Sequence, residues 1–182
     1  MTSSSQTSSG GDEDPHAGGP ATAPALLTLR LETFLPYRLN VLSAAILRSL
    51  GGIFDAQFGI SIPEWRVIAA LGQFGTMTAK QVGAHSRMHK TKVSRAVATL
   101  ERRALIARRS NKADLREAFL TLTESGAALY HSIVPVAREF GEKLTSDLDP
   151  SQQALFDHVL NKLLARAVAL GGASSAADDE LD

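Results

Sequence analysis

The sequence predicts a mainly α-helical fold with one small β-hairpin, and three observations support this prediction. Apolar residues recur at helical spacing through long segments, over residues 35–58, over 124–147 and again after residue 149. Three shorter helical patterns lie between the first two long segments. After Leu105 the pattern changes to runs of strand-forming residues.

The first two predicted helices are marked by their stripes and their ends. The segment 35–58 places apolar residues on one face, namely Leu39, Leu42, Ile46, Leu50 and Ile53. Ser61 and Glu64 have the spacing of a capping box, with Pro63 in the first turn. They predict a second helix that stops near residues 72–75.

A short helix, a turn and a longer amphipathic helix follow. Thr78 and Gln81 form another capping box for a helix over about 79–85. The longer helix is predicted from about His89 to Arg103, with Val93, Val97 and Leu100 on its apolar stripe. Its other face carries hydroxyl and cationic groups, namely Lys90, Thr91, Lys92, Ser94 and Arg95. This arrangement is a helix-turn-helix pattern.

Two predicted strands come directly after that helix. Residues 105–109 and 117–123 are rich in strand formers and enclose the polar stretch 110–116, and Leu120 and Leu122 are expected to face the core. A helix-turn-helix followed by a basic hairpin is a winged helix-turn-helix. The helix suits a major groove, and the hairpin can place an Arg along flanking phosphates or in a minor groove.

Basic residues are concentrated in the same part of the chain. Between Lys80 and Arg116 there are eleven Lys and Arg residues against two acidic ones, a local charge of +9, although the whole chain is neutral. The acidic residues near the two ends of the chain conceal this excess. Such a focused patch is typical of a polyanion-binding surface.

Other features of the sequence argue against catalysis and membranes. The chain has no cysteine, its five histidines lack metal-ligand spacing, and it has neither a nucleophile elbow nor a phosphate-binding glycine loop. We therefore expect a protein that is not an enzyme and has no catalytic residue, metal or cofactor. No secretory signal and no uninterrupted apolar run of membrane-spanning length is found, so a cytoplasmic protein without a membrane partner is expected.

The chain divides into three parts by composition. Residues 1–25 and the acidic end, 171–182, are expected to be disordered tails, because they hold too little apolar surface to offset the entropy lost on ordering. Residues 26–170 are expected to form one domain, with the winged helix-turn-helix lobe at 61–123.

Residues 61–126 resemble the MarR family of bacterial transcription regulators. The segment RMHKTKVSRAVATLERRALIARR is similar to that family's recognition helix and first wing strand, and ADLREAFLTLTESG is similar to its wing signature. The resemblance implies a homodimer, with 30–60 and 124–170 as dimerisation helices. It also implies binding to a pseudo-palindromic operator in double-stranded DNA, usually as a repressor that a small ligand releases.

The resemblance also implies roles for individual residues. Lys90, Thr91, Lys92, Ser94 and Arg95 would face the major groove or its phosphates. Arg116 matches the wing arginine, and Asp114 matches the acid that orients it. The family often has a basic residue where this chain has Leu115, and Arg108, Arg109 and Lys112 are expected to restore phosphate contacts.

The ligand site implied by the resemblance lies between the dimer helices and the DNA-binding lobe. There the chain supplies Tyr37, Arg38, Trp65 and Arg66. An aromatic ring beside an arginine suits an anionic aromatic effector, since the guanidinium can clamp a carboxylate or phosphate. This is similar to the branch that controls degradation of aromatic acids, whose effectors are acids or their coenzyme A thioesters. In the alternative, Trp65 anchors the core and Arg38 is a surface charge.

Two other functions are consistent with the residues. A helical metabolite-binding or coenzyme A-binding protein, or an enzyme, could use the basic patch to hold an anionic cofactor. An architectural DNA-binding protein would need no ligand.

Overall fold

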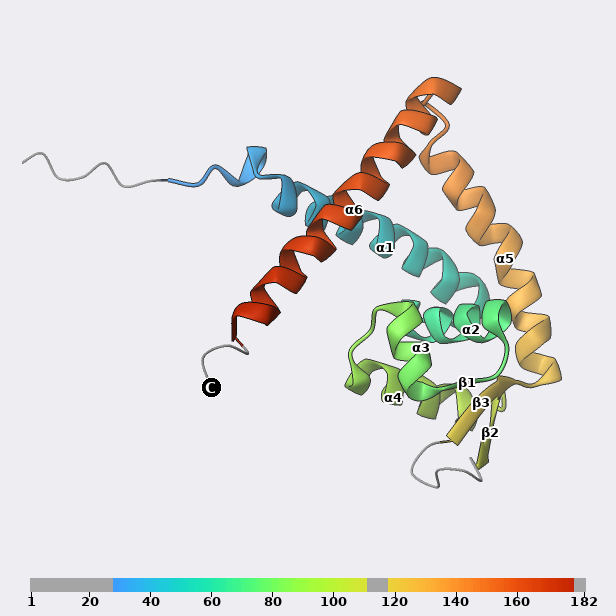
Figure 1. Cartoon of the computed structure of the whole chain (residues 1–182). Coiled ribbons are helices and arrows are strands. Elements are labelled where there is room, and N and C mark those ends of the chain that lie inside the picture. Colours follow the sequence, from blue (N-terminus) through green and yellow to red (C-terminus); the bar gives the residue numbers. More distant parts are fainter. Residues whose placement is uncertain (1–27, 111–117, 179–182) are drawn as a thin grey trace, which may run out of the picture. The chain divides into compact units, whose positions relative to one another are not determined.

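The computed structural model describes residues 28–110 and 118–178 (Figure 1). The chain divides into two compact units, residues 1–40 and 41–182. In the first unit the described residues form a short 3-10 helix, η1 (Leu31–Thr33), and the first turns of α1 (Leu35–Phe58). The Thr33 hydroxyl donates to the Arg30 carbonyl at 3.1 Å and fixes the short helix.

The helix predicted over 35–58 is confirmed as α1. It ends at Gly59, whose φ of +60° is a conformation that glycine adopts without strain. After the linker, α2 (Ile62–Phe74) begins as predicted. The carboxylate of Glu64 accepts from the Ser61 backbone N–H at 2.8 Å and from its hydroxyl at 2.7 Å.

The helix-turn-helix is formed by α3 (Ala79–Ser86) and α4 (Lys90–Arg102). Gln81 accepts from the Thr78 backbone N–H at 2.8 Å, and the Gln81 N–H donates to the Thr78 hydroxyl at 3.3 Å, so the predicted capping box is present. The turn contains Arg87 with φ of +52°, and the Met88 N–H donates back to the Gly83 carbonyl.

A three-stranded antiparallel sheet completes the lobe. Its strands are β1 (Met77–Thr78), β2 (Ile106–Ser110) and β3 (Ala118–Leu122), in the order β1-β3-β2. The hairpin prediction is confirmed: Arg108 pairs with Leu120 across the ladder, and Leu120 is fully buried. β1 could not be predicted from the sequence, because two residues are too few to show a strand period.

Two long helices follow the sheet, α5 (Glu124–Leu144) and α6 (Pro150–Asp178). α5 contains Pro135 and ends earlier than the predicted residue 147, because the N–H groups of Thr145 and Ser146 close a turn onto Glu142 and Lys143. α6 continues beyond the predicted boundary at residue 170. Paired glycines at 171–172 weaken a helix, but the alanines after them favour its continuation.

The core lies where α2, α4, β3 and α5 meet. Its fully buried side chains come from several elements and include Phe54, Ile68, Leu100, Leu120 and Ile133. Aromatic rings extend the core at one side, where Trp65 stacks on Tyr130 with ring centroids 6.2 Å apart. The predicted fold class, mainly helical with a small hairpin wing, is confirmed.

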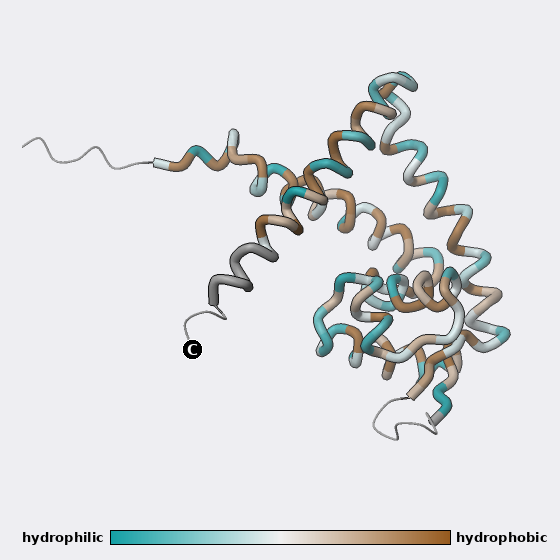
Figure 2. Tube along the Cα trace, viewed as in Figure 1, coloured by the Kyte–Doolittle hydropathy of each residue, from teal (hydrophilic) through white to brown (hydrophobic). Residues whose placement is uncertain are grey.

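α6 differs from the helices of the lobe, because its described side chains are almost all exposed. Hydrophobic residues nevertheless recur along it (Figure 2). Seven large apolar side chains on this helix are between 43% and 63% exposed, namely Leu155, Phe156, Val159, Leu160, Leu164, Val168 and Leu170.

By length and composition, α1 is the one helix of the described chain that could cross a membrane. Its most apolar window has a mean hydropathy of 1.3 and is 6% buried. This finding qualifies the expectation that no segment is apolar enough to do so. Arg48 lies in the middle of α1, and an arginine at the centre of a bilayer costs about 2.5–3.5 kcal/mol, so α1 is a weak candidate for a membrane span.

Candidate nucleic-acid interface

The second helix of the helix-turn-helix has two chemically different faces. Val93, Ala96, Val97 and Leu100 are buried and hold α4 against the core. The five α4 residues that are predicted to contact DNA are exposed together on the opposite side, namely Lys90, Thr91, Lys92, Ser94 and Arg95. Because burial of the apolar stripe fixes the rotation of the helix, these groups face outward as a set.

The start of α4 is capped by an unusual residue. His89 is the N-cap, and its Nδ1 accepts from the Thr91 backbone N–H at 3.4 Å. Lys90 and Lys92 have no acidic partner within the described residues, so their charges are available to a polyanion. The exposed amide end of a helix adds a further partial positive charge in the same place.

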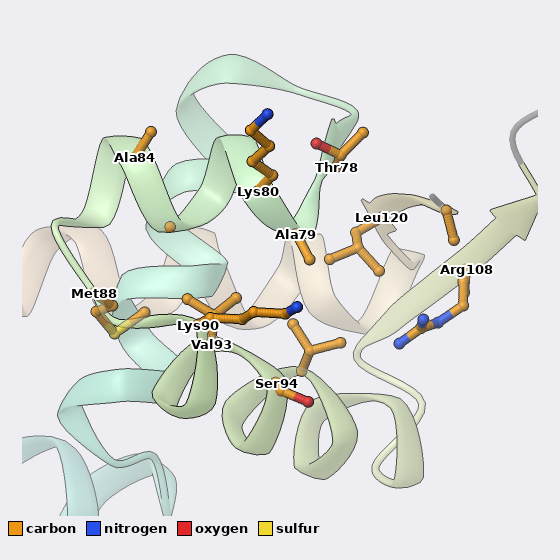
Figure 3. Close-up of a pocket in the computed structure, with 13 residues that line it drawn as sticks. Thr78, Ala79, Lys80, Ala84, Met88, Lys90, Val93, Ser94, Arg108 and Leu120 are labelled. Atoms are coloured by element: carbon orange, nitrogen blue, oxygen red, sulfur yellow. The ribbon is translucent and has the colours of Figure 1, made fainter. Parts of the chain in front are cut away.

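A groove lies between α3, α4 and the hairpin, with a volume of about 740 Å³. Its floor is apolar and includes Val93, Val97 and Leu120. Lys90 from α4 and Arg108 from β2 extend into it from opposite sides (Figure 3). Lys80 and Lys90, which have no acidic partner among the described residues, add positive charge beside the apolar floor, so an anionic chain can run past the first turns of α4.

The hairpin arginines have different surroundings. Arg108 makes a bidentate ion pair with Glu101 of α4, with Nε–Oε1 at 2.8 Å and Nη2–Oε2 at 2.9 Å. The hydrogen bonds to Glu101 raise the pKa of Arg108 above its ordinary value. Arg109 is exposed, and strand alternation directs it to the opposite face of the sheet from Arg108. The two residues therefore cannot grip the same row of phosphates from one face.

The remaining wing residues fall in a part of the chain that is not described. Lys112, Asp114 and Arg116 lie outside the described residues, so their DNA contacts stay predictions.

The end of α4 is held by two further arginines. Arg103 Nη1 donates to the Gly59 carbonyl at 2.8 Å and so connects the end of α4 with the end of α1. Arg102 Nη2 donates to the Thr99 hydroxyl of its own helix at 3.1 Å. Arg103 thus has a structural contact that its sequence position does not reveal.

Two residues of this surface are missing from the predicted site. Lys80 lines the groove from the first turn of α3, where its place in the basic window is the only sequence signal. Glu101 is missing because its partner Arg108 lies beyond a reversal of the chain, so no helical or strand spacing connects the two.

The predicted ligand residues lie on two elements. Tyr37 and Arg38 are exposed in the first turns of α1, within the first compact unit. On α2, Trp65 stacks on Tyr130 and meets the edge of Phe54 with centroids 5.3 Å apart, which agrees with the alternative that it anchors the core. Arg66 is half-buried, and no ion pair is found for it among the described side chains.

The histidines of the lobe have local roles. His85 packs against Phe74 with ring centroids 4.3 Å apart, and His89 caps α4. A search of the described residues finds no group of side chains that could hold a metal ion.

Comparisons with known proteins agree with this geometry. A family model described as "MarR family" matches residues 58–117, the segment that contains the helix-turn-helix and the first wing strand. Over this segment the chain is similar to the MarR family. Members of this family are transcription regulators and not enzymes, so the match agrees with the prediction that the chain is no enzyme. None of the curated proteins compared with the chain matches it.

Solved structures of several proteins share the fold. A MarR/EmrR family regulator from Acinetobacter sp. ADP1 is 23% identical, with 78% of this chain and 99% of that chain covered and a TM-score of 0.70. MepR of S. aureus, solved with DNA, is 22% identical, with 73% and 98% covered and a TM-score of 0.67. BpsR of Bordetella bronchiseptica, whose DNA binding is regulated by 6-hydroxynicotinic acid, is 22% identical, with 69% and 98% covered and a TM-score of 0.60. At such identities the likeness shows the fold alone.

Proposed function

We propose that this chain is a MarR-type regulator that binds a pseudo-palindromic operator as a homodimer in the cytoplasm. It represses transcription until a small anionic ligand releases it. The observation that carries the DNA-binding part is the exposed, unpaired cationic face of α4 beside a groove that Lys80 and Lys90 line. The first turns of α4 enter the major groove, and the adjacent phosphates pass along the groove between α4 and the hairpin.

The homodimer is supported by the exposed apolar residues of α6. A monomer in water seldom leaves so many large apolar side chains uncovered on one helix. A second copy of α6 would cover them with the same residues, as twofold symmetry requires. Twofold symmetry in the protein then implies a pseudo-palindromic operator.

A salt titration tests the electrostatic part of the proposal. Because each phosphate contact releases counterions, log affinity should fall with log salt by about 0.9 per contact on double-stranded DNA. Lys92→Gln should reduce that slope by about one contact. Lys162→Gln, which removes an exposed lysine from α6, should leave the slope unchanged. A flat response of the wild-type protein would contradict the proposal.

The wing arginine has its own test. Arg116→Ala should weaken operator binding, because it removes the arginine that the family resemblance places at the DNA. An unchanged affinity would exclude Arg116 from the mechanism.

We propose an aromatic carboxylate or its coenzyme A thioester as the releasing ligand. The support is the set of residues that the family resemblance implies for the ligand site, Tyr37, Arg38, Trp65 and Arg66, together with BpsR, a protein of the same fold that responds to an aromatic acid. Trp65 is the chain's single tryptophan, so its fluorescence reports binding nearby. Titration with 6-hydroxynicotinate, benzoate and benzoyl-coenzyme A should change the fluorescence and release DNA over the same concentration range. Release without any change at Trp65 would place the ligand elsewhere.

A further inference from the structure

The ion pair between Glu101 and Arg108 joins the recognition helix to the wing. Glu101 lies in the last turns of α4, and Arg108 is the third residue of β2. Both nitrogen–oxygen distances are below 3 Å, and the guanidinium and carboxylate meet in the two-point geometry that favours a single relative orientation. The Glu101 side chain is 29% exposed and that of Arg108 is 52% exposed, so water screens the pair only in part.

The backbone around the pair explains why these two residues meet. Arg108 lies opposite Leu120 in the ladder, and Leu120 is fully buried toward the helices. Directly opposed residues of an antiparallel pair share one face of the sheet, so Arg108 projects to the α4 side. Arg109 projects to the other side and has no acidic partner among the described residues.

The pair also changes the charge that the wing offers to DNA. Two donors of the Arg108 guanidinium, Nε and Nη2, are already bonded to the Glu101 carboxylate, so they cannot also grip a phosphate at two points. The ion pair has no net charge. Cations of this surface without an acidic partner among the described residues lie instead on α3, on α4 and at Arg109. Those cations are therefore free to meet phosphates, whereas Arg108 is held by another side chain of the protein.

We infer that Glu101 and Arg108 form a brace that sets the wing relative to the recognition helix. Both are positioning residues for DNA binding and neither is a phosphate contact in its own right. This inference rests on the proposed DNA-binding function. Its physical content is that α4 and the hairpin must reach adjacent parts of one duplex, so an error in their relative placement weakens both contacts.

Glu101→Gln distinguishes a brace from a phosphate contact, because the two roles predict opposite signs. If Arg108 were a contact restrained by Glu101, the substitution would free the arginine and remove a negative charge near DNA. Affinity would rise and the salt slope would steepen by about one contact. For a brace, affinity falls about three- to fivefold, which is the range expected for a partly exposed two-point pair, and the slope does not steepen.

Reversal of the pair gives a second, independent readout. Glu101→Arg and Arg108→Glu should each weaken binding when made alone, and their combination should recover most of the wild-type affinity with the wild-type salt slope. A phosphate contact at Arg108 would instead be lost in the combination. Thermal unfolding of each variant shows whether it still folds. Recovery of DNA affinity in the combined variant would show that the single substitutions act by displacing the wing and not by unfolding the protein.

The exposed pair on α5 provides a matched control. Glu139 and Lys143 meet at 2.6 Å, one helical turn apart, and Glu139→Gln should leave DNA affinity unchanged. The binding probe is a duplex that the wild-type protein selects from a random pool. Failure of the wild-type protein to select any duplex would overturn the proposed function and this role of the pair together. Wild-type binding with unchanged or stronger binding by Glu101→Gln would overturn the brace alone.

Discussion

At the scale of single residues, the junction between α4 and β2 holds a strained alanine. Ala104 has φ of +54°, a conformation that costs a non-glycine residue about 1–2 kcal/mol. Its neighbours hold it there: the Thr123 hydroxyl donates to the Ala104 carbonyl at 2.7 Å, and the Ala104 N–H donates to the Glu101 carbonyl at 2.9 Å. The strain is the cost of turning directly from the recognition helix into the wing.

Ala104→Gly should stabilise the protein by about 0.5–1 kcal/mol. Glycine removes the strain, and its greater freedom in the unfolded chain offsets part of that gain. Denaturant unfolding measures the change. Ala98→Gly, at an exposed position inside α4, is the matched control and should destabilise by about 0.5–1 kcal/mol. Equal effects of the two substitutions would contradict a strained Ala104.

Gly126 shows the opposite situation. It is buried in the first turn of α5, and a methyl group on it would collide with the backbone carbonyl of Leu105, which a side-chain rotation cannot relieve. We expect Gly126→Ala to destabilise by about 2 kcal/mol or more in thermal unfolding. Gly141→Ala in the same helix meets no atom within 4 Å and should stabilise by up to about 1 kcal/mol. A neutral Gly126→Ala would mean that the approach of Leu105 is not needed.

At the scale of elements, α4 is held at its far end on two sides. Glu101 connects it to β2, and Arg103 connects it to the end of α1 through the Gly59 carbonyl. The last carbonyls of a helix attract cations, so Arg103 suits that position both as a donor and as a charge. The recognition helix therefore leaves its first turns free for DNA and uses its last turns for attachment.

Arg103→Ala should destabilise the protein by about 0.5–1.5 kcal/mol, because it removes a charged donor from a carbonyl in the α1–α2 linker. Arg102→Ala is the control, since that side chain contacts only the Thr99 hydroxyl of its own helix among the described residues, and a change within about 0.5 kcal/mol is expected. Chemical denaturation of both variants measures the difference. Similar values for the two arginines would show that the link to α1 adds nothing.

The elements that could be predicted from sequence are those specified by short-range patterns. The capping pairs Ser61–Glu64 and Thr78–Gln81 act over three residues, so the sequence places those helix starts well. The exposed face of α4 follows from its apolar stripe for the same reason. The pairing of Glu101 with Arg108 and the strand β1 depend on contacts between distant parts of the chain, and no local period reports them.

At the scale of the whole molecule, the neutral net charge conceals an uneven distribution of charged and apolar residues along the chain. The chain has 19 basic and 19 acidic residues, yet its positive excess gathers in the lobe that carries α4 and the wing. The exposed apolar residues gather instead on helices outside that lobe, above all on α6. One part of the chain thus has the chemistry for a polyanion, and another has the chemistry for a second protein surface.

This division predicts that loss of the dimer weakens DNA binding without altering the DNA-binding residues. Leu160→Glu combined with Leu164→Glu places charges within the exposed apolar stripe of α6, so the molar mass in solution should fall from that of a dimer to that of a monomer, 19.4 kDa. Operator affinity should then fall by about a hundredfold, because the second half-site is no longer bound by a linked copy. Light scattering and a gel shift measure the two effects.

The control for this variant introduces a glutamate at an exposed apolar residue outside α6. Phe74→Glu puts a charge at another exposed apolar residue, within the lobe at the end of α2, and should leave the molar mass of the dimer unchanged. A dimer that survives both glutamates on α6 would show that this helix is not the dimer surface. A monomer that keeps the full affinity for a two-site operator would show that the two lobes bind independently. The apolar residues of α6 would then not be needed to bring two recognition helices onto one duplex.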